Sequence, residues 1–349
     1  MTNWYAYIGS RTTAERQGRG TGLSVQHIDS TTGRWTHLQD IELINPSYLC
    51  FGPGQRHLYV THGDRSEVSA FSIDDRSGTL ALLGTVPCGG TNPVHLVAAD
   101  EFTLVVANYA TGSVALIAIN PDGSLAGGPH HLLNLADQGE SSKSHPHQVL
   151  PDPLSGLIIV PDKGADTVFL LELHPAHSAV AAKIAASAGA GPRHALLHPR
   201  LDRVYVANEL DSTVTTYEFD RARTELTPLQ TLPTVPLSAA EPNSAAGIVG
   251  AFDLRFLYVS NRGHNSVACY SVDRGTGLLT AAGWTATGGE CPRFITLGPT
   301  GTDLYATNER SDTIVALTID PETGTLKRQS CAVSTGSPVC VLFRPATHH

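Results

Sequence analysis

A repeat of about 46 residues is the feature that most constrains the fold of this chain. Prolines that open short apolar runs lie 46, 47 or 53 residues apart, except for one gap of 100 residues that spans two periods. The opener missing from that gap falls at Ala245. The six opening prolines are Pro46, Pro93, Pro146, Pro192, Pro292 and Pro338. Self-similarity at this period is typical of propellers, solenoids and other repeat arrays.

Each repeat contains four short runs that read as β-strands. After the opening run comes a second one such as Leu257-Tyr258-Val259, and then a third such as Val267-Ala268-Cys269-Tyr270. A turn rich in Asp and Gly follows, for example residues 273–277, and a fourth run completes the unit. Asp and Gly suit tight turns between antiparallel strands. Four strands in every ~46 residues is the period of a propeller blade.

The two chain ends supply complementary parts of one more unit. The C-terminal end has an opening run at residues 337–343 and then stops, whereas the N-terminal end begins with a second run at residues 5–8. A β-sandwich or a solenoid does not explain why the incomplete units at the two chain ends complement each other. The sequence therefore predicts an all-β, seven-bladed β-propeller with four antiparallel strands per blade. We expect a ring closed by a blade shared between the termini, and a single domain over residues 1–349 despite this length.

Composition excludes several classes of partner. The formal net charge is −9 and no Lys/Arg stripe occurs, so we expect neither nucleic acid nor membrane as a partner. None of the six cysteines forms C-x-x-C or pairs with His at zinc-site spacing. The N-terminus lacks a basic segment followed by a long apolar one, and no run of 18 apolar residues occurs. We expect a soluble cytoplasmic protein without a cofactor, whose oligomeric state the sequence does not reveal.

Equivalent positions of the repeats collect charged side chains. One set comes just after the opener and a second set follows the second run of each repeat. The first set is Ser47, Val94, His147, Arg193, Ala246, Arg293 and Val339, and the second is Arg11, Gly63, Tyr109, Lys163, Glu209, Arg262 and Glu309. Because equivalent positions of a propeller form rings around its axis, we expect these charges to line a shared central cavity.

The excess of cations in these sets favours a site for a small anion. Buried charges are costly unless they are paired, hydrated or bound to a ligand, so a blade-to-blade salt bridge is the alternative for any single residue. The position before the second set also repeats, as Asn108, Asp162, Asn208, Asn261 and Asn308. Asn and Asp bond nearby backbone in turns. They also bind hard metals such as calcium, although we expect no metal here.

The segments His145-Pro146-His147, Gly191-Pro192-Arg193-His194, residues 206–210 and residues 257–262 resemble a known family. It is the family of seven-bladed propeller lactonases, which includes propeller-type 6-phosphogluconolactonases and carboxy-cis,cis-muconate cyclases. The resemblance extends over nearly the whole chain. It implies a catalytic cluster of His147, Arg193, Glu209 and Arg262. One departure from the family pattern is the strand at residues 246–252, which we expect to alter the rim beside Arg262.

These residues suit hydrolysis of a small anionic sugar lactone. Glu209 or His147 would take a proton from water, provided that burial moves its pKa toward neutrality. Arginines would hold a phosphate or carboxylate and face the oxyanion. We expect Arg11, Lys163, Arg293, Glu309 and Tyr109 to bind the substrate, a lactone or carboxylate. A carboxymuconate-type lactonising cycloisomerase and a non-catalytic binding scaffold stay as alternatives, whereas the absence of G-x-S-x-G disfavours a serine nucleophile.

Overall fold

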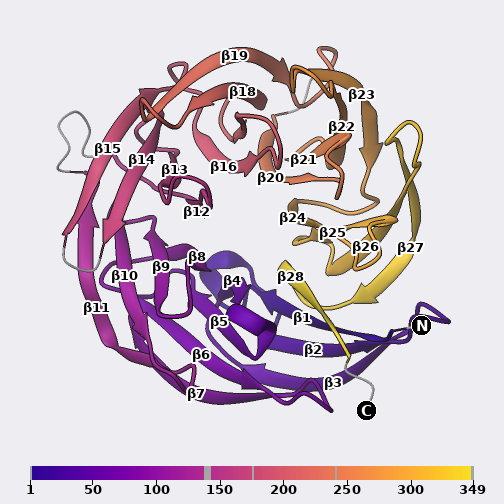
Figure 1. Cartoon of the computed structure of the whole chain (residues 1–349). Coiled ribbons are helices and arrows are strands. Elements are labelled where there is room, and N and C mark those ends of the chain that lie inside the picture. The colour runs from indigo at the N-terminus through magenta and orange to yellow at the C-terminus, as the bar shows by residue number, and fades with distance from the viewer. Residues whose placement is uncertain (1, 137–142, 175–176, 240–241, 347–349) are drawn as a thin grey trace. The chain divides into compact units, whose positions relative to one another are not determined.

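Seven four-stranded sheets make up the computed structural model of this chain (Figure 1). The structure describes residues 2–136, 143–174, 177–239 and 242–346. In this part of the chain the only helices are the short 3-10 helices η1 (Ala14–Arg16) and η2 (Pro53–Gln55). The predicted all-β class, with seven blades of four antiparallel strands, is confirmed. Among the described residues, no helix has the length and apolarity that crossing a membrane requires.

The chain divides into two compact units. Unit 1 comprises residues 1–149, 174–178 and 332–349, and unit 2 comprises residues 150–173 and 179–331. The single domain over residues 1–349 stays a prediction. Unit 1 contains the sheets β28 (Pro338–Pro345), β1 (Trp4–Ser10), β2 (Gly22–Ile28), β3 (Trp35–Glu42); β4 (Pro46–Phe51), β5 (His57–His62), β6 (Glu67–Ile73), β7 (Leu80–Pro87); and β8 (Pro93–Ala98), β9 (Thr103–Asn108), β10 (Ser113–Ile119), β11 (Leu125–Asn134).

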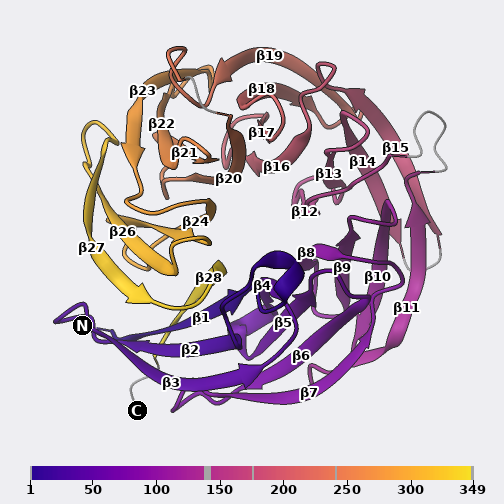
Figure 2. The same cartoon turned by 180° about the vertical axis from the view of Figure 1, so that it is seen from behind.

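Unit 2 contains four sheets built in the same way, except that residues 174, 177–178 and 332–334 at the ends of their strands belong to unit 1 (Figure 2). Their strands are β12 (Leu150–Pro151), β13 (Ile158–Asp162), β14 (Thr167–His174), β15 (His177–Ala185); β16 (Pro192–Leu197), β17 (Arg203–Asn208), β18 (Thr213–Asp220), β19 (Glu225–Pro233); β20 (Ser244–Gly250), β21 (Phe256–Arg262), β22 (Ser266–Val272), β23 (Leu279–Ala286); and β24 (Pro292–Leu297), β25 (Asp303–Asn308), β26 (Thr313–Ile319), β27 (Leu326–Ser334). First strands of several successive sheets are in contact, as β16 is with β20 and β4 with β8.

One blade of unit 1 combines both ends of the chain, as the sequence predicts. Strand β28 pairs antiparallel with β1, from Trp4 opposite Pro345 to Ser10 opposite Pro338. The first strand of this blade therefore comes from the C-terminal end and the other three come from the N-terminal end. The backbone groups of β1 on that side are paired rather than left as an open sheet edge.

The core lies between neighbouring blades. Leu257, Tyr258 and Val259 of β21 are fully buried, because both faces of this second strand are covered. The fourth strand β23 instead has exposed positions along most of its length. β-Branched and aromatic side chains fit such a pleated, covered surface. One hydrophobic cluster joins Tyr205 of the β16–β19 blade to Val259 of the next blade, so burial couples successive blades of unit 2.

A bulge in the first strand of the blades places the residues after the openers. In the β16–β17 ladder Pro192 pairs with Asn208 and His194 pairs with Ala207, so Arg193 is the extra residue. The same shift between Pro292 and Phe294 makes Arg293 the extra residue of β24. A bulge bends the strand and re-aims the side chain of the extra residue. Ala245 pairs with Asn261 as Pro192 pairs with Asn208, which confirms Ala245 as the missing opener.

Buried tyrosines tie successive blades together. The hydroxyl of Tyr258 donates to the carbonyl of Gly324 at 2.9 Å, and that of Tyr205 donates to the carbonyl of Gly277 at 2.8 Å. Each glycine closes the Asp-x-x-x-Gly turn of the next blade, with a φ of 70° at Gly324 and 74° at Gly277. That left-handed conformation suits glycine because it has no Cβ.

We expect Tyr258→Phe to lower the free energy of unfolding by about 0.5–1.5 kcal/mol, because the Gly324 carbonyl loses its hydroxyl donor and keeps only the weaker Cys269 thiol at 3.1 Å. The measurement is urea denaturation of the two proteins side by side. Tyr217→Phe is the matched control: Tyr217 is also buried, and no described residue accepts a hydrogen bond from its hydroxyl. Equal losses in the two variants would contradict a specific contribution of the Tyr258 hydrogen bond.

Candidate active site

Glu209 is the centre of a charged cluster in unit 2. Its Oε1 lies 2.7 Å from Lys163 Nζ, and its Oε2 lies 2.9 Å from both Arg193 Nε and Arg262 NH2. The side chains of Glu209 and Arg193 are only 9% and 3% exposed. The structure thus brings together four of the predicted site residues. Three cations surround one carboxylate, which leaves an excess of two positive charges in the cluster.

The blade repeat positions these four side chains. Lys163 and Glu209 directly follow β13 and β17, and Arg262 is the last residue of β21. Arg193 projects from the bulge of β16. The Glu209 amide donates to the Gly191 carbonyl at 2.7 Å, which fixes the carboxylate close to that bulge. Equivalent places on three successive blades therefore converge on one carboxylate.

The three cations hold the pKa of Glu209 well below its usual range. Burial alone would raise this pKa, but Arg262, Arg193 and Lys163 together outweigh it. The condition under which Glu209 would act as proton acceptor, a pKa moved toward neutrality, is therefore not met. Burial lowers the pKa of Arg193 to about 9, assisted by the neighbouring Arg262 charge, so Arg193 stays cationic at neutral pH.

Backbone carbonyls of β20 anchor both arginines. Arg193 NH1 donates to the Ala246 carbonyl at 2.6 Å, and Arg262 NH2 donates to the Ala245 carbonyl at 3.2 Å. These carbonyls belong to the strand where the sequence departs from the family pattern, and no side-chain pattern indicates their role. Arg262 Nε is buried and has no hydrogen-bond partner among the described residues. A buried donor of this kind is suited to a ligand.

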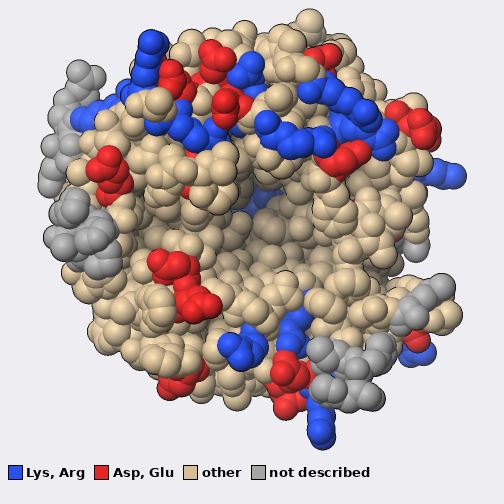
Figure 3. Space-filling view, in the orientation of Figure 1, with Lys and Arg blue, Asp and Glu red and all other residues tan. Residues whose placement is uncertain are grey.

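Arg293 and Glu309 lie on the next blade of unit 2. The charge of Arg293 contributes to lowering the pKa of Arg193. Glu309 Oε2 accepts a weak hydrogen bond from Cys291 Sγ at 3.7 Å. Burial raises the pKa of the Cys291 thiol, so Cys291 is a poor nucleophile at neutral pH. Figure 3 shows Lys and Arg side chains gathered over unit 2 on this face, with acidic side chains among them.

The predicted residues His147 and Tyr109 meet in unit 1. Their rings form an edge-to-face contact with centroids 5.7 Å apart, and His147 is 5% exposed. The ring of His145 stacks on Tyr109 at 4.4 Å, and its Nδ1 lies 2.8 Å from the Tyr109 carbonyl oxygen. His145 belongs to the motif that carries the family resemblance. No pattern in the sequence indicates that it holds Tyr109 in place.

Arg11 is buried in unit 1 beside Gly63. Its NH1 lies 3.8 Å from Asp64 Oδ2, and only 2% of Arg11 is exposed. A Cβ at Gly63 would lie 2.5 Å from Arg11 NH1, so a glycine at this position makes room for the guanidinium group. The structure thus places a buried cation where the repeat predicts one.

The repeated Asn residues serve the structure of the blades. Asn261 Oδ1 accepts hydrogen bonds from Thr234 Oγ1 and Asn243 Nδ2, at 2.7 and 3.0 Å. Asn208 Nδ2 donates to Thr213 and Thr215. Within the described ranges, no group of three or more His, Cys, Asp or Glu side chains is placed to hold a metal ion. All six cysteines are thiols rather than disulfides.

Comparisons with known proteins agree with this architecture. The model of the family "Lactonase, 7-bladed beta-propeller" matches residues 5–343. A 6-phosphogluconolactonase of Bacillus subtilis is 29% identical, over 98% of this chain and 99% of the relative. One of Yersinia pseudotuberculosis is 30% identical, over 88% of this chain and 90% of the relative.

A solved structure of high similarity is the periplasmic gluconolactonase of Pseudomonas aeruginosa. It has a TM-score of 0.89 and 26% identity, with coverage of 98% of this chain and 99% of that chain. A putative 6-phosphogluconolactonase of Bacteroides fragilis has a TM-score of 0.87 at 26% identity, with coverage of 98% of both chains. The chain belongs to the family of seven-bladed β-propeller lactonases.

Proposed function

We propose that this chain hydrolyses a small anionic sugar lactone of the 6-phosphogluconolactone type. The observation that carries the proposal is the cluster in unit 2, where Lys163, Arg193 and Arg262 surround the single carboxylate of Glu209. The excess positive charge favours an anionic ligand, and the family favours a lactone. Relatives named 6-phosphogluconolactonase support a phosphorylated sugar as the substrate.

Each member of the cluster has a proposed task. Arg193 and Arg262 present guanidinium groups, which bind phosphate or carboxylate oxygens in a bidentate manner. Arg262 Nε is the donor best suited to the oxyanion that forms when water attacks the lactone carbonyl, since it is buried and bonds no described residue. The ring C–O bond then breaks, and the ring oxygen leaves as the sugar hydroxyl after it takes up a proton.

Glu209 acts as a positioning residue in this proposal. Its carboxylate stays ionised at neutral pH and holds three cations at distances of 2.7 to 2.9 Å. A carboxylate whose pKa is so strongly lowered is a weak base, which disfavours it as the acceptor of the water proton. That task stays a prediction for His147, as does substrate binding by Arg11, Tyr109, Arg293 and Glu309.

The test of the function is a hydrolysis screen of lactones that differ only in their anionic group. We expect kcat/KM for 6-phosphogluconolactone to exceed that for unphosphorylated gluconolactone at least about tenfold, and the difference to shrink at high salt. Equal turnover of both lactones would contradict the anion site. If the protein converts a carboxymuconate and hydrolyses neither lactone, its proposed activity becomes the lactonising reaction instead of hydrolysis.

The cytoplasm is the proposed location, although one structural relative is described as periplasmic. The thiol state of all six cysteines supports a reducing compartment. Fractionation of cells that express the untagged full-length protein tests this location.

A further inference from the structure

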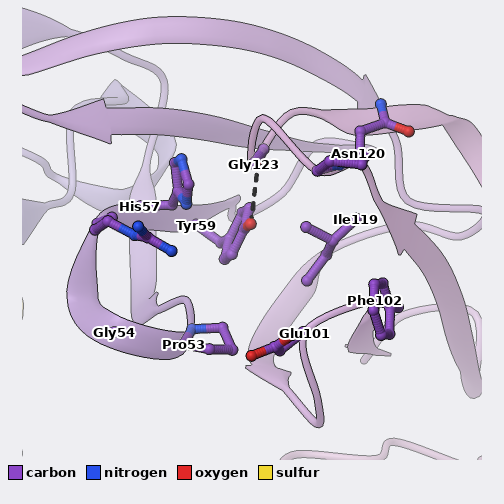
Figure 4. A pocket seen from close by; sticks show the side chains of 11 residues that line it. Pro53, Gly54, His57, Tyr59, Glu101, Phe102, Ile119, Asn120 and Gly123 are labelled. Atoms are coloured by element: carbon purple, nitrogen blue, oxygen red, sulfur yellow. Dashed lines mark hydrogen bonds between the residues drawn. The ribbon is translucent and has the colours of Figure 1, made fainter.

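A cavity of about 340 Å³ lies between the second and third sheets of unit 1 (Figure 4). It is formed by η2, the start of β5, the β8–β9 turn and the β10–β11 turn. His57 at the start of β5 lines it, whereas the predicted site residue Tyr109 follows the end of β9. The cavity is therefore at the opposite end of these blades from Tyr109. Its volume lies within the range of small-molecule sites.

A shorter turn keeps this cavity open. The turns at Asp74–Gly78 and Asp273–Gly277 place glycine four residues after aspartate, with the glycine amide bonded to the aspartate carbonyl at 2.8 Å. In the β10–β11 turn Gly123 comes only three residues after Asn120, and its amide bonds the Asn120 carbonyl at 2.9 Å. The loss of one residue shortens the wall that this turn presents to the preceding blade.

The side chain that packs on the turn glycine differs between blades. Arg203 begins β17 and donates from Nε to the Thr276 carbonyl of the next blade at 2.8 Å. His57 begins β5 at the equivalent position, two residues before the tyrosine that bonds the turn glycine. Its ring packs on Gly123, where a Cβ would lie 2.2 Å from ring atoms. At the same position Tyr5 packs on Gly78 and Phe256 on Gly324. The imidazole is the smallest of these four side chains and leaves space that a larger one would occupy.

The cavity combines an apolar floor with a polar rim. Tyr59, fully buried, donates from its hydroxyl to the Gly123 carbonyl at 3.1 Å, and Ile119 lies beside it (Figure 4). Phe102 lines the cavity although 65% of it is exposed. Glu101 supplies a carboxylate at the rim, whereas the Asn120 amide points away from the cavity and bonds Ser124 at 2.9 Å (Figure 4). An exposed aromatic ring can pack on the C–H face of a sugar, while carboxylate and guanidinium groups bond its hydroxyls.

The rim carries no excess charge, in contrast to the cluster around Glu209. Arg56 contributes a positive charge and Glu101 a negative one. Burial and the Arg56 charge lower the pKa of His57, so its imidazole is neutral at pH 7. The balance gives no preference for a phosphate or a carboxylate, and it suits a ligand that is rich in hydroxyls and uncharged.

We propose that this cavity is a binding site for an uncharged mono- or disaccharide, separate from the lactonase site. Phe102 is the stacking platform, and Glu101 and Arg56 are the hydroxyl partners. The site depends on the short β10–β11 turn and on the histidine at position 57, since the equivalent residues Tyr5, Arg203 and Phe256 are larger.

Titration of the full-length protein with D-glucose and with maltose, followed by saturation-transfer NMR and calorimetry, tests the site. We expect saturable binding in the millimolar range, weakened at least about tenfold by Phe102→Ala. His57→Arg introduces the residue that stands at the equivalent position 203 of β17. The longer side chain would fill the cavity and is expected to abolish binding. Phe252→Ala is the matched control: Phe252 is 71% exposed in the β20–β21 turn, and its removal is expected to change nothing.

Each outcome decides between the proposal and its competitors. Lactonase activity and melting temperature show that the variants fold, and both are expected to match those of the unmodified protein. The proposal is overturned by the absence of saturable binding of either sugar, or by binding that survives both His57→Arg and Phe102→Ala. The proposal is also overturned if Arg193→Ala abolishes glucose binding, because glucose would then bind at the anion site. It is overturned as well if glucose 6-phosphate binds the cavity of His57 and Phe102 far more tightly than glucose, because the cavity would then be an anion site.

Discussion

Arg193→Ala is expected to lower kcat/KM for a phosphorylated sugar lactone at least about a hundredfold while the chain still folds. The side chain is 3% exposed, its Nε contacts Glu209 and its NH1 contacts the Ala246 carbonyl. The substitution removes the fixed cation of Arg193 from the cluster and leaves one side of the Glu209 carboxylate open. Glu209 keeps Lys163 and Arg262 as partners, so no buried charge is left alone and folding is retained.

Steady-state kinetics of purified variants measure this effect, with circular dichroism and thermal melting as evidence of folding. Arg203→Ala is the matched control. It removes an arginine from the same blade, at the end of β17 opposite Glu209, where the guanidinium group bonds Thr276 and Glu218. Turnover of this control should stay within about twofold of the unmodified protein, the range expected for a change outside the site. An Arg193→Ala enzyme with unreduced turnover would remove Arg193 from the proposed site.

The fold could be predicted because the repeat constrains it strongly. One opener has no proline, yet the spacing alone placed it at Ala245, and the strand ladder confirms that position. The match between the runs at the two chain ends predicted the shared blade, which the pairing of β28 with β1 confirms. Periodicity survives substitution because every blade must bury the same strands against its neighbours.

Part of the site could be predicted and part could not. Repeat spacing grouped Lys163, Arg193, Glu209 and Arg262, and they do meet. The bulge that aims Arg193 and the carbonyls of Ala245 and Ala246 depend on ladder register, which side-chain types do not reveal. The direction of the pKa shift of Glu209 also depends on distances. Burial suggested an increase, whereas three cations close to the carboxylate produce a decrease.

Glu209→Gln is expected to reduce kcat/KM for the same lactone at least about a hundredfold, as Arg193→Ala does, but for a different reason. The glutamine side chain would keep the shape of the glutamate but lack the charge that holds Lys163, Arg193 and Arg262 in place. These three cations would then repel one another, and their donors would lose a fixed geometry. Glu218→Gln is the matched control, since Glu218 pairs with Arg203 at 3.2 Å on the same blade and its side chain is 53% exposed.

The same substitution should lower the free energy of unfolding at pH 7 by about 3 kcal/mol, the scale of a broken buried ion pair. Since the pKa of Glu209 is lower in the folded than in the unfolded chain, its carboxylate stabilises the fold at pH values above about 4, the ordinary Glu value. That contribution diminishes as the pH falls below about 4, because the unfolded chain then binds the proton first. Urea denaturation at pH 7 and at pH 3 should show the gap between Glu209→Gln and the unmodified protein narrowing at the lower pH. A gap that is equal at both values would mean that charge on Glu209 is not what holds the cluster together.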